Sequence, residues 1–318
     1  MKWGNAKVQN LKRRLFVKKF NSVVNNTVNF KLDNSDLLTI TILTSHGSVN
    51  MAIAQLKSLY RFLETKFPLE IHDDGSLTNT DIALLKQAFV GVEIITRDKA
   101  DQQIEAYFKE KNYTYLKKFR DKHNINLQCT DLAFFCKTKY CIQIDTDILF
   151  FKTPYFLDND FLTEVIENGK NYSYYNLDRG PAYAYQDDDI KKYLNKDMPF
   201  QFNAGICLYP VSRELYYRYA EDILSQSFPI HNNHVENQTV QSMSLQLIGK
   251  CIPLKEDVDV ALRFLELSNI NYNYSVITTQ HYCAWSRNLF YLDFIEKIYP
   301  FVKKPSSYQQ YFYKILKG

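Results

Sequence analysis

The sequence predicts an α/β fold built on a largely parallel β-sheet that is flanked by helices. Short apolar, β-branched runs at 37–44, 69–72, 92–95 and 140–144 are typical of buried strands. Segments with a helical spacing of apolar residues lie between these runs, and strands that alternate with helices form parallel sheets. No internal repeat, low-complexity tract or Pro/Gly-rich linker marks a domain boundary.

The helices of the first half follow their strands in order. Apolar residues recur near helical spacing through 48–66, and 79–90 has the same character. Helical stretches then continue to about Phe135. The second half is less regular. It predicts strands near 172–175 and 205–209, helices at about 212–227 and 235–248, and a strand-like stretch at 276–279.

Length and composition describe an ordinary globular protein. The 318 residues are 46% hydrophobic and 23% charged, which excludes wholesale disorder. No run approaches the ~18 apolar residues of a membrane-spanning helix, and the N-terminus lacks the apolar stretch of a secretory signal. The six cysteines form no CxxC pair, which favours reduced, buried thiols over a zinc site or a disulfide framework. We therefore expect a cytoplasmic protein.

The two ends of the chain are cationic and its middle is anionic. Residues 1–32 carry eight basic side chains and no acidic one, and 301–318 carry four and again no acidic one. Removing these twelve from the formal net charge of +4 leaves 33–300 at −8. Basic and aromatic residues together suit an anionic membrane surface, so we expect peripheral attachment through both ends. The alternative is a solvated basic face, and the acidic body disfavours a nucleic-acid partner.

Two carboxylates, Asp145 and Asp147, directly follow the apolar strand 140–144. Ligands of parallel sheets bind at the carboxyl ends of the strands. Carboxylates flanked by apolar runs are costly unless a cation offsets them, and this spacing lets both reach one Mg²⁺ or Mn²⁺ ion. The Asp-x-Asp pairs at 187/189 and 257/259 lack this strand context. The alternative for 145/147 is two acids that cap the loop after the strand.

The second strand also ends in acidic residues, Asp73 and Asp74, followed by Gly75. Gly75 supports a tight turn, and an acid at this point can accept hydrogen bonds from a base or a ribose. An Asx turn that leads into the next helix is the alternative interpretation. Thr44, at the end of the first strand, is expected to lie at the same donor site.

Four segments, in this order, resemble those of nucleotide-sugar glycosyltransferases with the GT-A fold, nearest to the family-8 galactosyl-, glucosyl- and glycogenin-type enzymes and their bacterial relatives. IHDDGSLT (71–78) resembles the nucleoside-binding turn, and IQIDTDILFFKTP (142–154) resembles the Asp-x-Asp strand. FNAGICLYP (202–210) is similar to the Asn-Ala-Gly segment. His281 and Arg287 match a His-x-x-Gly-x-x-Lys spacing near the C-terminus. The resemblance covers about 40–290 and implies a GT-A fold.

The resemblance implies a metal site and a site for the donor. Asp145, Asp147 and His281 would bind Mn²⁺ or Mg²⁺, and Asp145 would also contact the ribose or sugar of the donor. Arg287 would bind the diphosphate, where Arg can form a bidentate contact. Further contacts with the donor sugar are implied for Asn203 and Gly205.

The chain departs from the family pattern in several places. Ala284 replaces a glycine, and Asn237-Gln238 replaces an acidic residue followed by Gln. Gln238 is then the candidate beside the anomeric centre, and Glu236 is a weaker one. A basic residue is expected ahead of the Asp-x-Asp strand, where Asp131 aligns. Lys118 or Arg120 would supply that charge.

These observations predict a metal-dependent glycosyltransferase that moves a hexose from a nucleotide sugar, UDP-hexose by resemblance, to a glycan, lipid-linked or other hydroxyl acceptor with retention. A phosphatase of the haloacid-dehalogenase type and an inactive GT-A domain that acts as a partner are the alternatives. The expected organisation is a basic segment at 1–34, a catalytic domain at 35–298 and a basic, aromatic tail at 299–318. Within the catalytic domain, 35–155 would bind the donor and 156–298 the acceptor.

Overall fold

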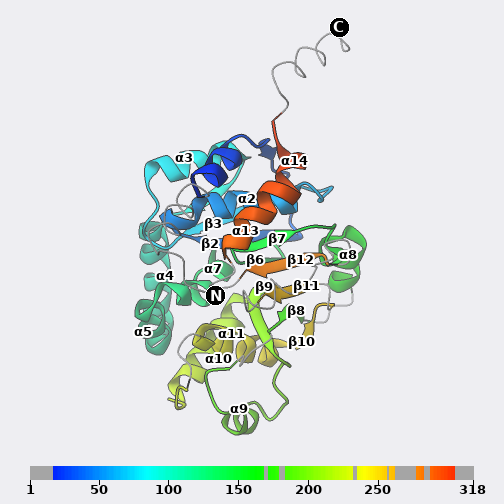
Figure 1. Cartoon of the computed structure of the whole chain (residues 1–318). Helices are drawn as coiled ribbons and strands as arrows, with labels where there is room; N and C mark the ends of the chain where they lie inside the picture. The colour runs from blue at the N-terminus through cyan, green and yellow to red at the C-terminus, as the bar shows by residue number, and fades with distance from the viewer. Residues whose placement is uncertain are drawn as a thin grey trace, which may run out of the picture.

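The computed structural model centres on one mixed sheet of seven strands (Figure 1). In spatial order these strands are β10 (Lys250–Pro253), β8 (Tyr172–Leu177), β9 (Phe202–Pro210), β6 (Tyr140–Ile144), β2 (Leu38–Thr44), β3 (Leu69–Asp73) and β5 (Glu93–Ile95). The strand β9 is antiparallel to β6 and β8, and the remaining pairings are parallel. The predicted α/β class with a largely parallel sheet is confirmed.

The structure describes residues 17–167, 171–178, 183–231, 235–255, 258–261, 277–282 and 287–304. Several residues discussed above lie outside these ranges. They are residues 1–16, Asp257 of the 257/259 pair, Ala284 and residues 305–318. The division of the chain at 34 and 298 stays a prediction.

Helices cover both faces of the sheet. Alternate strand residues point to opposite faces, so Ile40 and Ile142 belong to one buried apolar cluster and Cys141 and Cys207 to another. The first cluster is covered by α2 (Val49–Tyr60) and α13 (Arg287–Asp293). The second is covered by α4 (Arg97–Lys111), α5 (Thr114–Lys122), α10 (Arg213–Ser225) and α11 (Glu236–Ile248). The result is a three-layer α/β/α arrangement (Figure 1).

Most predicted elements are present, with different ends. The helix predicted to run to residue 66 ends at Tyr60, and Pro68 restricts Phe67 before the next strand to extended geometry. The strand predicted at 205–209 extends over Phe202–Pro210. The sequence missed the short strands β7 (Ile148–Phe150), β10 and β11 (Val258–Ala261). Together with β12 (Thr279–Tyr282), β7 and β11 form a small second sheet in the order β11-β12-β7.

The remaining elements are short or peripheral. They are β1 (Phe30–Lys31), η1 (His46–Ser48), α3 (Asn79–Ala88), β4 (Phe89–Val90), η2 (Asn124–Asn126), α6 (Leu127–Thr130), α7 (Leu132–Phe135), η3 (Tyr155–Leu157), α8 (Asn159–Glu167), α9 (Asp187–Leu194), the π-helix η6 (Phe294–Ile298) and α14 (Tyr299–Val302). The strands β1 and β4 pair in parallel as a separate ribbon.

The described parts of the two cationic ends, residues 17–32 and 301–304, lie side by side. A helical segment at 17–25 places Phe20 against Phe290 and Phe294. Backbone hydrogen bonds join Val28 to Val302 at 2.7 Å, and a further one joins Lys304 to Asn26. Among the residues that the structure describes, every helix falls short of the length and apolar content needed to cross a bilayer.

The cysteines behave as small apolar residues in the part of the chain that the structure describes. Cys129, Cys136, Cys141, Cys207 and Cys251 are buried and free. Burial raises the pKa of the Cys129 thiol to about 12, which keeps it protonated at neutral pH. The sixth, Cys283, lies outside the described residues.

Candidate active site

Three potential metal ligands converge beyond the end of β6. One donor atom from each of Asp145, Asp147 and His281 lies within 4.8 Å of the others. The Nε2 atom of His281 is 3.0 Å from Oδ1 of Asp147 and 3.6 Å from Oδ2 of Asp145. We call these three residues the Asp145 cluster. They are the three that the sequence predicted as metal ligands.

Strand pairing explains why residues so far apart in the sequence meet here. The antiparallel partner of β6 is β9, and Asp145 donates its backbone N–H to the carbonyl of Gly205 at 2.8 Å. After the turn, β7 pairs with β12, which carries His281 opposite Ile148. Tyr282 donates its backbone N–H to the carbonyl of Asp147, also at 2.8 Å. The loop with both carboxylates is therefore held from two sheets.

Each carboxylate uses one oxygen for an outer partner and turns the other toward His281. Gln128 donates from Nε2 to Oδ1 of Asp145 at 2.5 Å. Arg287 donates from Nε to Oδ2 of Asp147 at 3.2 Å. The Arg287 side chain is 58% exposed, so most of its guanidinium is accessible to an incoming anion.

The electrostatics of the cluster favour a cation. Burial raises the pKa of Asp145 to about 6, and the nearby charge of Asp147 acts in the same direction. Burial also acts to raise the pKa of Asp147, but the His281 imidazole and Arg287 outweigh it and lower that pKa. Two carboxylates therefore face one arginine and one imidazole. An imidazole that binds a metal ion is neutral, and with His281 in that form the cluster has one more carboxylate than cationic side chain.

The residues fit a divalent cation. Two carboxylate oxygens are the ligands that Mg²⁺ and Mn²⁺ prefer, and an imidazole nitrogen suits Mn²⁺ somewhat better than Mg²⁺. Three protein ligands leave coordination positions for phosphate oxygens and water.

Gly205 stands where no side chain fits. A Cβ atom at this position would lie 2.5 Å from Cε1 of His281 and 2.8 Å from Oδ1 of Asn203. The amide of Asn203 is held on both sides, because its Oδ1 accepts from Gly205 N at 2.8 Å and its Nδ2 donates to Asp178 at 3.0 Å. Asn203 and Gly205 therefore lie beside the cluster, and their contact with a donor sugar stays a prediction.

Solved structures identify the architecture that positions this cluster. The galactosyltransferase LgtC is similar over 86% of this chain and 99% of its own, with a TM-score of 0.51 and 12% identity. Mouse xyloside xylosyltransferase 1 is similar over 79% and 97%, with a TM-score of 0.51 and 14% identity. The bifunctional glycosyltransferase WbbM is similar over 91% of this chain and 53% of its own, with a TM-score of 0.52 and 15% identity. The chain has a GT-A fold. No family model and no curated protein sequence matches it.

The nucleoside-binding turn predicted for the GT-A fold lies at the carboxyl ends of β2 and β3. Asp73 accepts at Oδ1 from the backbone N–H groups of Gly75 and Leu77, at 2.8 and 3.0 Å. Asp74 accepts from Ser76 in the same way and donates its N–H to the carbonyl of Thr44. Gly75 has a φ of 101°, which favours glycine. These acids form Asx turns, and the turn lies at the same sheet edge as Asp145 because β6, β2 and β3 are parallel neighbours.

The first turn of α11 places three polar side chains toward the interior. Glu236, Asn237 and Gln238 are at most 7% exposed. Glu236 forms an ion pair with Lys122 at 2.6 Å, which occupies its carboxylate. Asn237 donates to Oε1 of Gln128 at 3.1 Å and so joins α11 to the Asp145 cluster.

Arg120 does not join the Asp145 cluster. Its guanidinium is 1% exposed and donates twice to Asp131, from Nε at 2.8 Å and from Nη2 at 2.7 Å. Nη1 donates to Asp101 at 2.6 Å, and Asp101 also pairs with Arg97. We call Arg120, Asp131 and Asp101 the Arg120 cluster. The other basic candidate, Lys118, is exposed on α5 and lies over the ring of Tyr115.

Gln128 is the contact of this site that the sequence analysis missed. It carries no motif, and it lies on the short helix α6 ahead of the Asp-x-Asp strand. The available signal was its polarity, because Leu127, Cys129 and Leu132 around it are buried.

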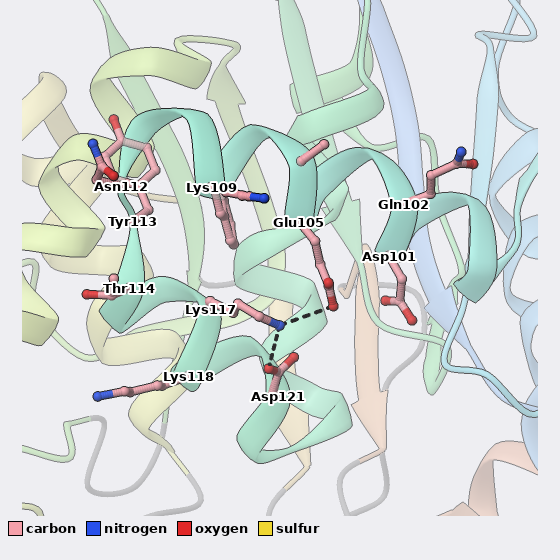
Figure 2. A pocket seen from close by; sticks show the side chains of 12 residues that line it. Asp101, Gln102, Glu105, Lys109, Asn112, Tyr113, Thr114, Lys117, Lys118 and Asp121 are labelled. Atoms are coloured by element: carbon pink, nitrogen blue, oxygen red, sulfur yellow. Dashed lines mark hydrogen bonds and ion pairs between the residues drawn. The ribbon is translucent and has the colours of Figure 1, made fainter.

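Two cavities lie away from the cluster. One, of about 800 Å³, is lined by α4, α5 and the turn between them. Figure 2 shows Lys117 between Glu105 and Asp121 in this cavity, where all three side chains are 45–46% exposed to solvent. The other, of about 460 Å³, lies where α9 meets residues 197–201, which lead directly into β9. Phe200, on its wall, is 68% exposed.

Proposed function

We propose that the protein is a metal-dependent glycosyltransferase that transfers a hexose from a nucleotide sugar, UDP-hexose in the first instance, to a hydroxyl acceptor with retention. The observation that carries this proposal is the Asp145 cluster, set at the carboxyl edge of a GT-A sheet with the exposed Arg287 beside it. LgtC, which shares the fold, was solved with donor and acceptor sugar analogues.

The residues of the cluster would hold the cation, and Arg287 would bind the diphosphate of the donor. When bound, the cation neutralises charge that develops on the diphosphate as the bond to the sugar breaks. Arg287 supplies a second positive charge to the same leaving group. The diphosphate oxygen takes the proton of the acceptor hydroxyl as the new bond forms on the same face of the sugar. The chain therefore needs no basic side chain, and Gln238 and Asn203 would orient the sugar.

The acceptor would approach from the side of β9. Residues 197–201 line the cavity beside Phe200 and lead into β9. Two residues of that strand, Asn203 and Gly205, lie next to the Asp145 cluster. Tyr183 and Phe200 line it together with Asp187 and Lys191. Aromatic faces with charged groups around them suit a sugar chain, because pyranose rings are apolar on their faces and polar at their edges. This supports an oligosaccharide acceptor.

A thermal-shift screen of nucleotide sugars, with and without Mn²⁺, tests the proposal. We expect a UDP-hexose to raise the unfolding temperature only when Mn²⁺ is present, and slow release of UDP to accompany it. Hydrolysis of p-nitrophenyl phosphate without any response to nucleotide sugars would favour the phosphatase alternative. Metal-dependent donor binding without turnover toward any acceptor would favour the inactive partner domain.

We also propose that the cationic end of the molecule binds an anionic membrane from the cytoplasmic face. Phe301 is 76% exposed, lies near the Arg61 guanidinium and is followed by Lys303 and Lys304. The exposed Lys18 and Lys19 lie on the helical segment 17–25. The residues that follow this segment form backbone hydrogen bonds with residues 302–304. Vesicles with and without phosphatidylglycerol provide the test. Binding to anionic vesicles should fall in Phe301→Ala and Lys303→Glu, and equal binding to neutral vesicles would refute the proposal.

A further inference from the structure

We propose that Gln128 and Asn237 form a neutral amide pair that positions Asp145 for the cation. Gln128 is a positioning residue, because it acts through Asp145, and Asn237 fixes the direction in which Gln128 points. The inference rests on the proposed function of the Asp145 cluster. It assigns a role to Gln128, which belongs to no motif, and to Asn237, which stands where the family pattern has an acidic residue.

Gln128 uses both ends of its amide. Its Nε2 donates to Oδ1 of Asp145 at 2.5 Å, and its Oε1 accepts from Nδ2 of Asn237 at 3.1 Å. Asn237 is 5% exposed and Gln128 is half-buried, so solvent competes little for either contact. Hydrogen bonds to a charged acceptor are stronger than those between neutral groups, which makes the contact to Asp145 the dominant one.

The contact decides which oxygen of Asp145 is available. With Oδ1 occupied by Gln128, Oδ2 remains as the atom that faces His281, at 3.6 Å. Asp147 is arranged in the same way, because Arg287 occupies Oδ2 and Oδ1 faces His281 at 3.0 Å. Each carboxylate therefore offers one oxygen beside the same imidazole nitrogen. Outer partners that orient ligands in this manner typically change metal affinity about 10- to 100-fold when removed.

The direction of the Gln128 amide depends on Asn237. An ionised Asp145 can only accept hydrogen bonds, so Gln128 must turn its NH₂ group toward it and its oxygen toward α11. Asn237 meets that oxygen with a donor. An aspartate at position 237 would be another acceptor, and it would draw the NH₂ group of Gln128 away from Asp145.

Neutrality is the second property of the pair. With His281 neutral, as a metal ligand must be, the cluster has one more carboxylate than cationic side chain, and Gln128 and Asn237 leave that balance unchanged. A cationic side chain at position 128 would cancel the excess carboxylate charge and oppose a divalent ion. An anionic side chain at position 128 would compete with the carboxylates for Nε2 of His281 or would add a further ligand to the metal site. The amide pair orients Asp145 without changing the charge of the site.

Titration of the metal-free full chain with Mn²⁺, followed by the EPR signal of free Mn²⁺, tests the pair without any turnover. We expect Gln128→Leu, which keeps the size of the side chain, to weaken Mn²⁺ binding about 10- to 100-fold. Gln241→Leu is the matched control. Gln241 lies one turn further along α11 and donates to Gln143 at 3.0 Å, so it forms a buried amide pair that does not contact Asp145. Gln241→Leu should leave the Mn²⁺ affinity within about threefold of that of the wild type.

A double-mutant cycle tests the direction of the amide. Asn237→Asp alone should weaken Mn²⁺ binding as Gln128→Leu does, because it turns the NH₂ group away from Asp145. The double variant with Gln128→Arg has a donor for both Asp145 and the new carboxylate at position 237, at unchanged net charge. We expect its Mn²⁺ affinity to be within about threefold of that of the wild type. Additive losses in the double variant would overturn the assigned direction.

The outcomes separate this inference from the proposed function. If the wild-type chain binds no Mn²⁺, both are overturned. If it binds Mn²⁺ and Gln128→Leu binds it equally well, the positioning role is overturned and the proposed function stands. If Gln128→Leu and Gln241→Leu weaken binding to the same extent, the effect is one of general packing, and the inference is again overturned.

Discussion

The Arg120 cluster and the Asp145 cluster contain similar side chains in different states of completion. In the Arg120 cluster, Asp131 and Asp101 both accept hydrogen bonds from Arg120, which is 1% exposed. Arg97 supplies a second positive charge to Asp101, so the charges balance. In the Asp145 cluster two carboxylates share one largely exposed arginine.

The difference separates a structural ion-pair network from a binding site. A closed network has no use for a ligand, since every polar atom has its partner within the chain. A network with a buried carboxylate that lacks a positive partner is costly in free energy, and binding of a cation can offset that cost. The cavity in Figure 2 differs from the Asp145 cluster in burial. Two carboxylates, Glu105 and Asp121, share Lys117 there, but all three side chains are 45–46% exposed, so water solvates the remaining charge. Buried charge without a partner therefore distinguishes the Asp145 cluster better than acidity or cavity size.

The largest expected effect is on activity at the Asp145 cluster. Asp147→Asn keeps the shape of the side chain but removes its charge and replaces one carboxylate oxygen by NH₂, so Mn²⁺-dependent transfer should fall by more than the roughly 100-fold seen for outer partners. Its denaturation midpoint should stay near that of the wild type, because Asn keeps an acceptor for Arg287 and removes one of two neighbouring negative charges. Release of UDP from the donor provides the measurement. Near-normal turnover in a folded variant would end the assignment of this cluster.

The reverse pattern is expected at the Arg120 cluster. Arg120→Met leaves Asp131 buried without a positive partner, and removal of one member of a buried pair costs about 3–5 kcal/mol. Guanidinium unfolding curves should show this loss, while Mn²⁺ affinity stays unchanged. Arg97→Met is the control, since Arg97 is 24% exposed and its pair should contribute less than about 1 kcal/mol. A stable Arg120→Met protein that has lost donor binding would instead place Arg120 in the donor site, as the sequence predicted.

The sequence was sufficient for the parts of the fold that depend on local pattern. β2 and β6 are largely apolar, β3 begins with an apolar and polar alternation, and Asp145 is recognisable because it directly follows β6. The small sheet was not predictable in this way, because β7 has three residues and its partner β12 lies far along the chain. The contact between His281 and Asp147 depends on that pairing, so only the family resemblance brought the two together in advance.

Side-chain partners were the least predictable feature. Arg120 stands in the expected region ahead of the Asp-x-Asp strand. No local pattern shows that Asp131, eleven positions later between α6 and α7, accepts two of its three hydrogen bonds. Gln128 belongs to no motif, and its importance follows from the position of α11, which the sequence alone does not fix. Charge partners across elements are set by packing, and packing is not a local property.

A third buried charge sharpens the comparison, because it is neither balanced nor open to a ligand. Lys57 is 2% exposed, donates to the hydroxyl of Thr27 at 2.6 Å, and has no acidic partner among the described residues. Burial, together with the charge of Lys304, lowers the pKa of Lys57 from 10.5 to about 7. The native protein therefore binds fewer protons than the unfolded chain between about pH 7 and 10.5, and this difference makes stability rise with pH in that range.

Lys57→Met should remove this dependence. Relative to the variant, the wild type should gain about 1.4 kcal/mol of unfolding free energy for each pH unit between 7 and 10. Urea unfolding curves at several pH values measure it, and the variant should be the more stable protein at pH 7. Lys86→Met, which alters an exposed lysine on α3, is the control and should show no such slope. Parallel curves for Lys57→Met and the wild type would contradict the buried charge.

The smallest expected effect concerns the cavity at Phe200, which lies beyond the Asp145 cluster along β9. Phe200→Ala removes an exposed ring, and the loss of roughly 40 Å² of apolar contact with a sugar is worth about 1 kcal/mol, which is about a fivefold rise in KM for an oligosaccharide acceptor. Transfer to a monosaccharide and release of UDP without acceptor should not change, because neither reaches residues 197–201. Phe301→Ala removes a similarly exposed ring that does not line this cavity, and it should leave all three rates unchanged. An equal change for both acceptors would show that Phe200 acts on the cluster itself, and that the acceptor does not extend into this cavity.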